Sequence, residues 1–175
     1  EKIDEYNYSI EGTPVDCINF ALGGLKLDPD FIFSGVNNGY NLGFDIKYSG
    51  TVGACYQAQH LGFKSIAVSS DYKGNIVLEK ELEKTMDYVI EKNLLSEKHV
   101  LNINFPQEKD LKSKGIKITS PFYRRYEYRP KMTENRYEPN RKLVKNEELP
   151  ENSDGCAIRN GYTSISILDN SKPLS

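Results

Sequence analysis

The chain of 175 residues lacks the features of several protein classes. Lysine and arginine number 23 against 25 aspartates and glutamates, and this net charge of -2 gives no electrostatic reason to bind nucleic acid or an anionic membrane. No apolar run is long enough to span a bilayer, and the first residues are charged, unlike a signal peptide. We therefore expect a cytoplasmic protein with no nucleic-acid and no membrane partner.

Cysteine is also scarce. Cys17, Cys55 and Cys156 are an odd number at wide spacing, and the absence of a Cys-x-x-Cys pair argues against a zinc site or a redox motif. Cys17 and Cys55 fall on the predicted core faces of helices, so we expect both to be small buried hydrophobes. The Gly-x-Ser-x-Gly elbow of many hydrolases and the Walker loop of nucleotide triphosphatases are missing as well.

The chain does contain an alternation of helices and strands. A helix is predicted from 13 to 25, because Thr13, Pro14 and Asp16 form a capping-box start. The pattern continues with predicted strands at 31–36, 64–70 and 99–105, and with helices near 51–61 and 78–90. This order predicts an α/β fold of the Rossmann-like type, with a mainly parallel sheet and helices on both faces.

The character of the chain changes after residue 106. The segment 122–150 is crowded with Tyr, Arg, Lys, Glu and Pro and is too aromatic for a disordered linker. We interpret it as an extended β arm that packs on a partner subunit, while 163–168 reads as a closing strand. The predicted division is therefore a core portion, 1–106, and an oligomerisation arm with the closing strand, 107–175.

The candidate site lies between residues 34 and 51, where a glycine- and asparagine-rich loop follows a predicted buried strand. Asn37 stands at the carboxyl end of that strand, the edge where α/β sheets bind ligands. Its amide oxygen suits Mg²⁺, Mn²⁺ or Ca²⁺ if carboxylates are supplied nearby. The alternative is that the asparagines only form turns. Gly35, Gly39 and Gly43 allow the backbone to turn tightly and come close to a ligand.

A second candidate feature is Ser49-Gly50-Thr51, at the predicted start of the next helix. Hydroxyls and unpaired amides at a helix start favour a phosphate group. The alternative is that Ser49 is an ordinary N-cap residue. Asp45, between the two features, could orient a base, help to hold a metal or cap a turn.

Several segments together resemble the survival protein SurE family. They are residues 12–17, 34–43, 48–52, 65–69, 101–106 and 157–166, with Asp45 in addition. The segments occur in the order of the family and cover nearly the whole chain, and the run from 34 to 52 is the most specific of them.

The resemblance implies a metal-dependent nucleotidase that hydrolyses nucleoside 5′- and 3′-monophosphates and in some cases short polyphosphate. Asn37 matches a metal ligand of the family, with Mg²⁺ or Mn²⁺ the expected ion. Ser49, Asn41 and Thr51 match the catalytic lining, and Ser49, Gly50 and Thr51 the phosphate-binding turn. The resemblance also implies a Rossmann-like core and a homodimer or homotetramer that assembles through the arm at 107–150.

One part of the family pattern is missing. The family opens with an Asn-Asp-Asp-Gly loop whose adjacent aspartates hold the metal, and this chain has no Asp-Asp pair. Asp154 is not expected to replace it, because it lies in the later part, outside the predicted core. We therefore expect a family member without its N-terminal portion, and a non-catalytic fragment that keeps the fold and arm is the alternative. The hydrolase hypothesis requires Asn37 and Ser49 to share one pocket.

Overall fold

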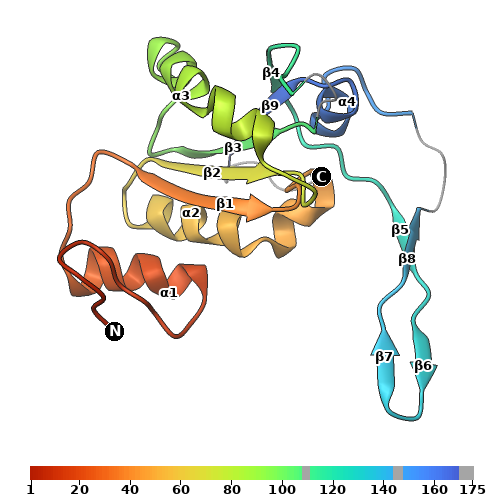
Figure 1. The fold of residues 1–175 in the computed structure, drawn as a ribbon, viewed down its shortest axis with the longest axis horizontal. Coiled ribbons are helices and arrows are strands. Elements are labelled where there is room, and N and C mark those ends of the chain that lie inside the picture. The colour runs from red at the N-terminus through yellow and green to blue at the C-terminus, as the bar shows by residue number, and fades with distance from the viewer. Residues whose placement is uncertain (108–110, 144–147, 170–175) are drawn as a thin grey trace.

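A computed structural model describes residues 1–107, 111–143 and 148–169, and its centre is a five-stranded sheet (Figure 1). The strands, in spatial order, are β1 (Ile32–Asn38), β2 (Ser65–Ser70), β3 (His99–Phe105), β9 (Thr163–Asp169) and β4 (Ile116–Thr119). The first three are parallel, β9 runs antiparallel to β3, and β4 is parallel to β9. The predicted mainly parallel α/β fold is confirmed.

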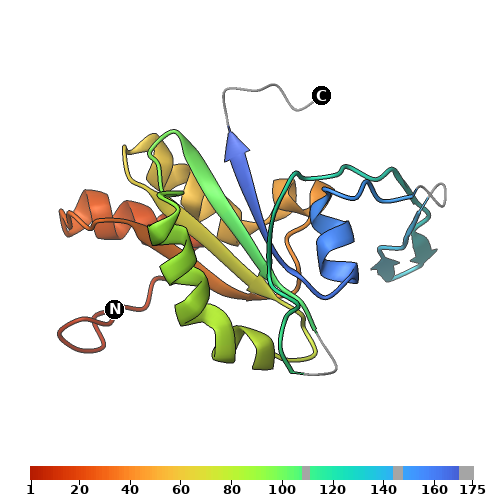
Figure 2. The same ribbon diagram turned by 90° about the horizontal axis from the view of Figure 1, so that it is seen from above.

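Helices cover both faces of the sheet, as predicted (Figures 1 and 2). Helix α2 (Gly50–His60) connects β1 to β2 on one face, and α3 (Ile76–Glu91) connects β2 to β3 on the other. The first predicted helix is present as α1 (Pro14–Ile18), with the expected capping box, and continues as a π-helical stretch, η1 (Asn19–Gly24). No helix in the described part of the chain is long and apolar enough to cross a membrane.

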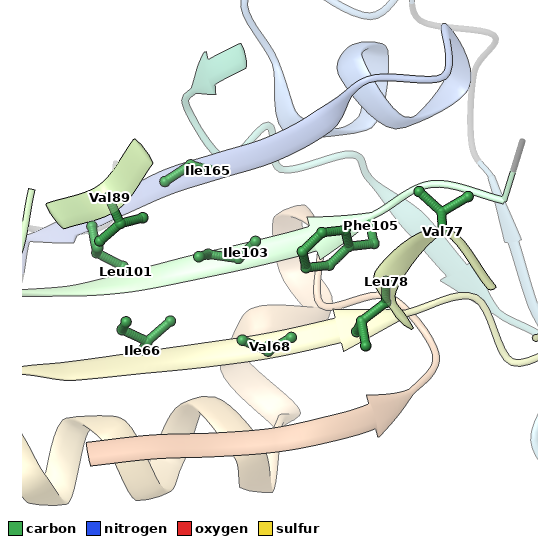
Figure 3. Close-up of a cluster of buried hydrophobic side chains, with 9 residues drawn as sticks. All are labelled: Ile66, Val68, Val77, Leu78, Val89, Leu101, Ile103, Phe105 and Ile165. Carbon is green, nitrogen blue, oxygen red and sulfur yellow. The ribbon is translucent and has the colours of Figure 1, made fainter. Parts of the chain in front are cut away.

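The main core lies between the sheet and α3. Alternation along β3 places Leu101, Ile103 and Phe105 on this face. They belong to a cluster of nine buried apolar side chains (Figure 3), namely Ile66, Val68, Val77, Leu78, Val89, Leu101, Ile103, Phe105 and Ile165. We call this side of the sheet the α3 face and the opposite side the α2 face.

The two cysteines expected in the core behave differently. Cys55 in α2 is fully buried, which confirms the prediction of a small buried side chain, and burial raises the pKa of its thiol to about 12. Cys17 is exposed, so the prediction was wrong there. Ile18 and Leu22 form the side of α1 and η1 that packs on α2, and successive helical residues point about 100° apart.

The predicted extended arm is present over residues 126–143, which we call the arm. Strand β5 (Tyr126–Tyr128) pairs with β8 (Arg141–Leu143), and β6 (Lys131–Thr133) pairs with β7 (Arg136–Glu138), both antiparallel. Figure 1 shows the arm projecting away from the sheet. The division of the chain at residue 106 stays a prediction, and β4 and β9 belong to the same sheet as β1 to β3.

Two short helices lie beside the arm and the loop. The 3₁₀ helix η2 (Gly43–Tyr48) follows the glycine-rich loop and leads into α2. Helix α4 (Asp154–Arg159) follows the arm and leads into β9. The glycine-rich loop therefore continues into η2, and the arm is followed by α4, which leads into β9.

Candidate functional site

Four polar side chains stand in register across the carboxyl end of the parallel strands. Asn37 of β1 is paired with Ser69 of β2, Ser69 with Asn104 of β3, and Asn104 with Ser164 of β9. Since neighbouring strands lie about 4.8 Å apart, these side chains stand next to one another on one face. Alternation with Val68 puts this polar row, as we call it, on the α2 face. Ser69, Asn104 and Ser164 are fully buried.

Asn37 occupies the position that the sequence predicted, near the carboxyl end of β1. Its Nδ2 donates a hydrogen bond of 2.7 Å to the carbonyl oxygen of Gly39. This bond fixes which way the carboxamide is turned, and it leaves Oδ1 as the atom able to contact a cation. Strand β1 runs to Asn38, two residues beyond its predicted end, so Asn37 belongs to the strand rather than to the loop.

Two of the loop glycines serve close approach to other parts of the backbone. Gly35 has a φ of +133°, and a Cβ there would lie 2.4 Å from the carbonyl oxygen of Val68 in β2. Gly43 has a φ of +50°, and a Cβ there would lie 2.3 Å from the carbonyl oxygen of Phe122. Any other residue at either position would meet both a backbone clash and an unfavourable conformation.

The middle of the loop is held by asparagine side chains of β3. The main-chain N–H of Asn41 donates to Oδ1 of Asn104 at 2.9 Å, and its carbonyl oxygen accepts from Nδ2 of Asn102 and of Asn104 at 2.8 and 3.2 Å. Its own Nδ2 donates to Oγ of Ser69 at 2.8 Å. Asn41 is buried, so it supports the loop from within; a direct catalytic role for it stays a prediction.

Sequence reasoning assigned no role to Asn102, Asn104 or Ser69, although a signal was present. Residues 101–105 read Leu-Asn-Ile-Asn-Phe, which places two amides on one face of a strand whose other face is apolar. Buried amides in a central strand need partners. The pattern therefore indicates a polar network, although it does not say which segment supplies the partner.

Asp154 lies against the same loop and was not expected there. Its Oδ2 accepts from the N–H of Gly43 at 2.7 Å, and its Oδ1 accepts from Gly155 at 2.7 Å and from Phe122 at 3.3 Å. It is almost completely buried, so the expectation that it lies outside the core was wrong. Burial raises the pKa of the Asp154 carboxyl above its ordinary range, against the opposing effect of these hydrogen bonds.

Ser49 is the N-cap of α2, and its Oγ accepts from the N–H of Val52 at 3.1 Å. The capping role considered from the sequence is therefore real, and the hydroxyl proton is still able to donate to a ligand. The N–H groups of Gly50 and Thr51 lie in the first turn, where a helix provides no acceptor. No acidic residue lies in this turn, so the local field favours an anion.

Asn37 and Ser49 lie at the same end of the α2 face. The thiol of Cys55 in α2 contacts Ser34 in β1, which fixes how the two elements pack. Ser49 lies six residues back along the helix, about 9 Å, and Asn37 lies three residues forward along the strand, about 10 Å. The helix runs opposite to the strand, so both displacements have the same direction. Convergence of Asn37 Oδ1 and the Ser49 hydroxyl in one pocket stays a prediction.

A cavity of about 300 Å³ lies between the loop and the root of the arm, and neither Asn37 nor Ser49 lines it. Its walls include Tyr40, Phe44, Phe122, Tyr126 and Asp154. Beside it, Asp45 forms a two-point ion pair with Arg141 of the arm, with one contact of 3.0 Å between Oδ2 and Nη2. Asp45 therefore links η2 to the arm, a role that was not among those considered from the sequence.

The divalent ion expected from the sequence requires a group of ligand side chains. Within residues 1–107, 111–143 and 148–169, no three His, Cys, Asp or Glu side chains form a group that could hold a metal ion. Asn37 offers one neutral oxygen, whereas Mg²⁺ sites in proteins are built around carboxylates. The described residues therefore do not form a metal site on their own.

Taken together, the sheet, its two covering layers and the polar row define a Rossmann-like α/β protein with a polar site at the carboxyl ends of its parallel strands. A sequence profile described as Survival protein SurE matches residues 1–128. The chain belongs to that family, as its sequence motifs predicted.

Individual relatives agree with this assignment. The chain is 36% identical over 174 residues to a protein of Marinomonas sp. (strain MWYL1) named 5′-nucleotidase SurE, covering 95% of this chain and 69% of the relative. A protein of the same name from Aquifex aeolicus is also 36% identical, with 95% and 70% covered. A crystal structure of the SurE protein from Aquifex aeolicus superposes with a TM-score of 0.74 at 34% identity, covering 97% of this chain and 72% of that one.

Proposed function

We propose that the protein is a phosphoric monoester hydrolase that acts on nucleoside 5′- or 3′-monophosphates, with short polyphosphate as a further substrate. The observation that carries this proposal is the placement of Asn37 and the start of α2 at one end of the α2 face, in a chain whose relatives are named 5′-nucleotidases. That end is where α/β proteins bind phosphorylated ligands.

Each predicted residue has a role that its chemistry permits. The unpaired N–H groups of Gly50 and Thr51 bind phosphoryl oxygens, and the Ser49 hydroxyl donates to the same group. Charge that develops on those oxygens during hydrolysis is stabilised by the same donors. The Thr51 hydroxyl lies one residue further into the first turn, and Asn41 is bonded within the loop to Asn104 of β3.

A divalent ion, Mg²⁺ or Mn²⁺, is the proposed cofactor, and it would supply charge neutralisation at the phosphoryl group. Asn37 Oδ1 is the ligand that this part of the chain offers. Because the described residues contain no suitable group of acidic side chains, the carboxylate ligands would have to come from other residues. The proposed enzyme is cytoplasmic, which agrees with three cysteines that are all free thiols.

The test is release of inorganic phosphate from nucleoside monophosphates by the full-length protein, with and without a chelator. Replacement Asn37→Ala should lower kcat at least about 100-fold, as expected when a group that positions the reacting phosphate is lost. Asn38→Ala is the matched control, because Asn38 is the next residue of β1 and is exposed. Equal activity in Asn37→Ala and wild type would remove Asn37 from the site.

The rival function is a non-catalytic nucleotide-binding scaffold. The observation in its favour is that the described residues do not complete a metal site. It predicts no release of phosphate at any Mg²⁺ or Mn²⁺ concentration, with nucleotide binding retained. Chelator-sensitive turnover by the wild-type protein would exclude it.

The arm is the proposed surface for assembly into a homodimer or homotetramer. Among the residues that the structure describes, its strands pair with each other, and Tyr128, Met132 and Tyr137 expose more than half of their surface. A two-stranded ribbon is marginally stable alone, so packing on a second copy would stabilise it. Met132→Glu with Tyr137→Glu should shift the sedimentation coefficient to that of the monomer. Glu134→Lys at the arm tip is the control, and an unchanged assembly in the double variant would disprove this use of the arm.

A further inference from the structure

We propose that Asn102 and Asn104 are positioning residues for the active site: they hold the backbone of Asn41 and so set the loop that joins Asn37 to Gly43. The part of this inference that concerns catalysis rests on the proposed nucleotidase function. The part that concerns the loop rests on the described contacts alone.

The side chain of Asn104 makes with the main chain of Asn41 the two hydrogen bonds that a neighbouring strand would make. Its Oδ1 accepts from the N–H of Asn41, and its Nδ2 donates to the carbonyl oxygen of the same residue. A carboxamide has the same donor and acceptor pair as a peptide group, so both main-chain groups of Asn41 are satisfied at once. Asn102 adds a second donor to that carbonyl oxygen. Three directional bonds therefore converge on one loop residue.

Burial makes this arrangement difficult to explain as a contribution to stability. Asn102 and Asn104 are fully buried, on the face of β3 opposite Leu101, Ile103 and Phe105. Within the described part of the chain, Oδ1 of Asn102 has no hydrogen-bond partner, and such an atom is costly to bury. An apolar residue would avoid that cost. The feature that only the asparagine supplies here is the donor to Asn41.

The loop held at Asn41 has Asn37, the proposed metal ligand, at one end and Gly43 at the other. On one side, Asn37 is turned by its bond to the carbonyl oxygen of Gly39. On the other, the N–H of Gly43 is bonded to Asp154. Loss of the central attachment would let the segment between these points move, and displacement by about 1 Å is enough to slow an enzyme about 100-fold.

The experiment compares three variants of the full-length protein: Asn104→Leu, Asn102→Leu and Ser166→Ala. Leucine has the same number of side-chain heavy atoms and the same branching as asparagine, but it neither donates nor accepts. Asn102→Leu also removes the unpartnered acceptor, so it keeps the test valid if Asn104→Leu fails to fold. Ser166 is the control, because it is fully buried, is paired with Asn102 across β3 and β9, and bonds to Thr119 rather than to the loop.

Two measurements are needed. The first is hydrogen exchange at the main-chain N–H of Asn41 and of Gly43, which should speed up at least about 10-fold in Asn102→Leu, although the direct partners of both groups remain. The second is steady-state kinetics well below the unfolding temperature. We expect kcat to fall about 100-fold with KM changed less than about threefold, because the loop sets the reacting geometry rather than overall binding. Ser166→Ala should differ from wild type by less than about threefold in both measurements.

The outcomes separate the two proposals. Unchanged exchange in Asn102→Leu, or an equal loss of kcat in Ser166→Ala, would overturn the inference. Faster exchange with wild-type kcat would restrict these asparagines to the loop and refute their link to catalysis. If the wild-type protein itself releases no phosphate, the proposed function fails, and the exchange measurement still decides whether the loop is held as we propose.

Discussion

The two faces of the five-stranded sheet have different roles in this protein. The α3 face carries one apolar cluster, in which six buried side chains of the sheet pack against three of α3 (Figure 3). The α2 face is apolar where Ile32, Ala67, Val100 and Leu168 pack, and it becomes polar toward the carboxyl ends of the parallel strands. Adjacent residues of β2 and β3 alternate between these environments, so the same strands serve both.

The difference shows how a sheet separates folding from positioning. Hydrophobic packing is non-directional, so the α3 face can stabilise the fold without fixing any single atom of the loop. Hydrogen bonds are directional and impose distances and angles on their partners. The polar network therefore controls the path of the loop, while the apolar face supplies much of the free energy that keeps the sheet in place.

The largest effect should follow from a cavity in the α3 face. Ile103→Ala removes a fully buried side chain and should lower the free energy of unfolding by about 2–5 kcal/mol, measured by urea denaturation. Ile118→Ala in β4 is the control, because Ile118 is 46% exposed and should change stability by less than about 1 kcal/mol. If phosphate release per folded molecule also dropped in Ile103→Ala, the stabilising role of the α3 face and the positioning role of the α2 face would not be independent.

A smaller effect, with a distinctive dependence on pH, should follow from Asp154→Asn. The amide cannot reproduce all three hydrogen bonds to main-chain N–H groups, and the loss should be about 1–3 kcal/mol. Because burial raises the pKa of Asp154 above 3.8, the folded protein binds this proton more tightly than the unfolded chain does. The stability that this group adds is full below its unfolded pKa and declines as pH rises through the folded value.

The measurement is therefore the unfolding free energy of wild type minus that of Asp154→Asn, between about pH 4 and about pH 7. This difference should decrease as pH rises. Subtracting the variant removes the contributions of other carboxyl groups, and Asp45→Asn, at a partly exposed ion pair, serves as the control. An increase with pH would mean that hydrogen bonding outweighs burial in setting the pKa of Asp154.

The smallest of these effects concerns the start of α2. Ser49→Ala removes the N-cap and should cost about 1 kcal/mol in unfolding free energy, measured by thermal denaturation. The KM for a nucleoside monophosphate should also rise, because a donor to the phosphate is lost. Ser49→Thr keeps the cap and the hydroxyl and should restore both values. A normal KM in Ser49→Ala would leave Ser49 with its capping role alone.

Much of the fold could be predicted because its signals are local. The capping box at Thr13, the alternation along β3 and the placement of Asn37 at a strand end are each contained in a few consecutive residues. The exposed position of Cys17 was missed because Cys17 lies about 100° around the helix from Ile18, which packs on α2.

The support of the site could not be predicted, because it joins distant parts of the chain. Asn41 and Asn104 are 63 residues apart, and Gly43 and Asp154 are 111 apart. Neither pair follows a sequence rule, since the partners meet only after β3 has entered the sheet and α4 has packed beside it. Asn37 and the Ser49-Gly50-Thr51 turn were indicated by the strand end and the helix start. The family resemblance added Asn41 and the expected roles, and all of these chemical roles stay predictions.

The arm leaves one further consequence for practical work. Its outer ribbon, β6 with β7, follows β5 and precedes β8 along the chain, and its turn at Glu134 and Asn135 is exposed (Figure 1). An exposed hairpin end of this kind commonly tolerates inserted sequence. A fluorescent label or an epitope placed between these two residues would sit at the far tip of the ribbon and would test whether the tip contacts a second copy, with the sheet and loop left as they are.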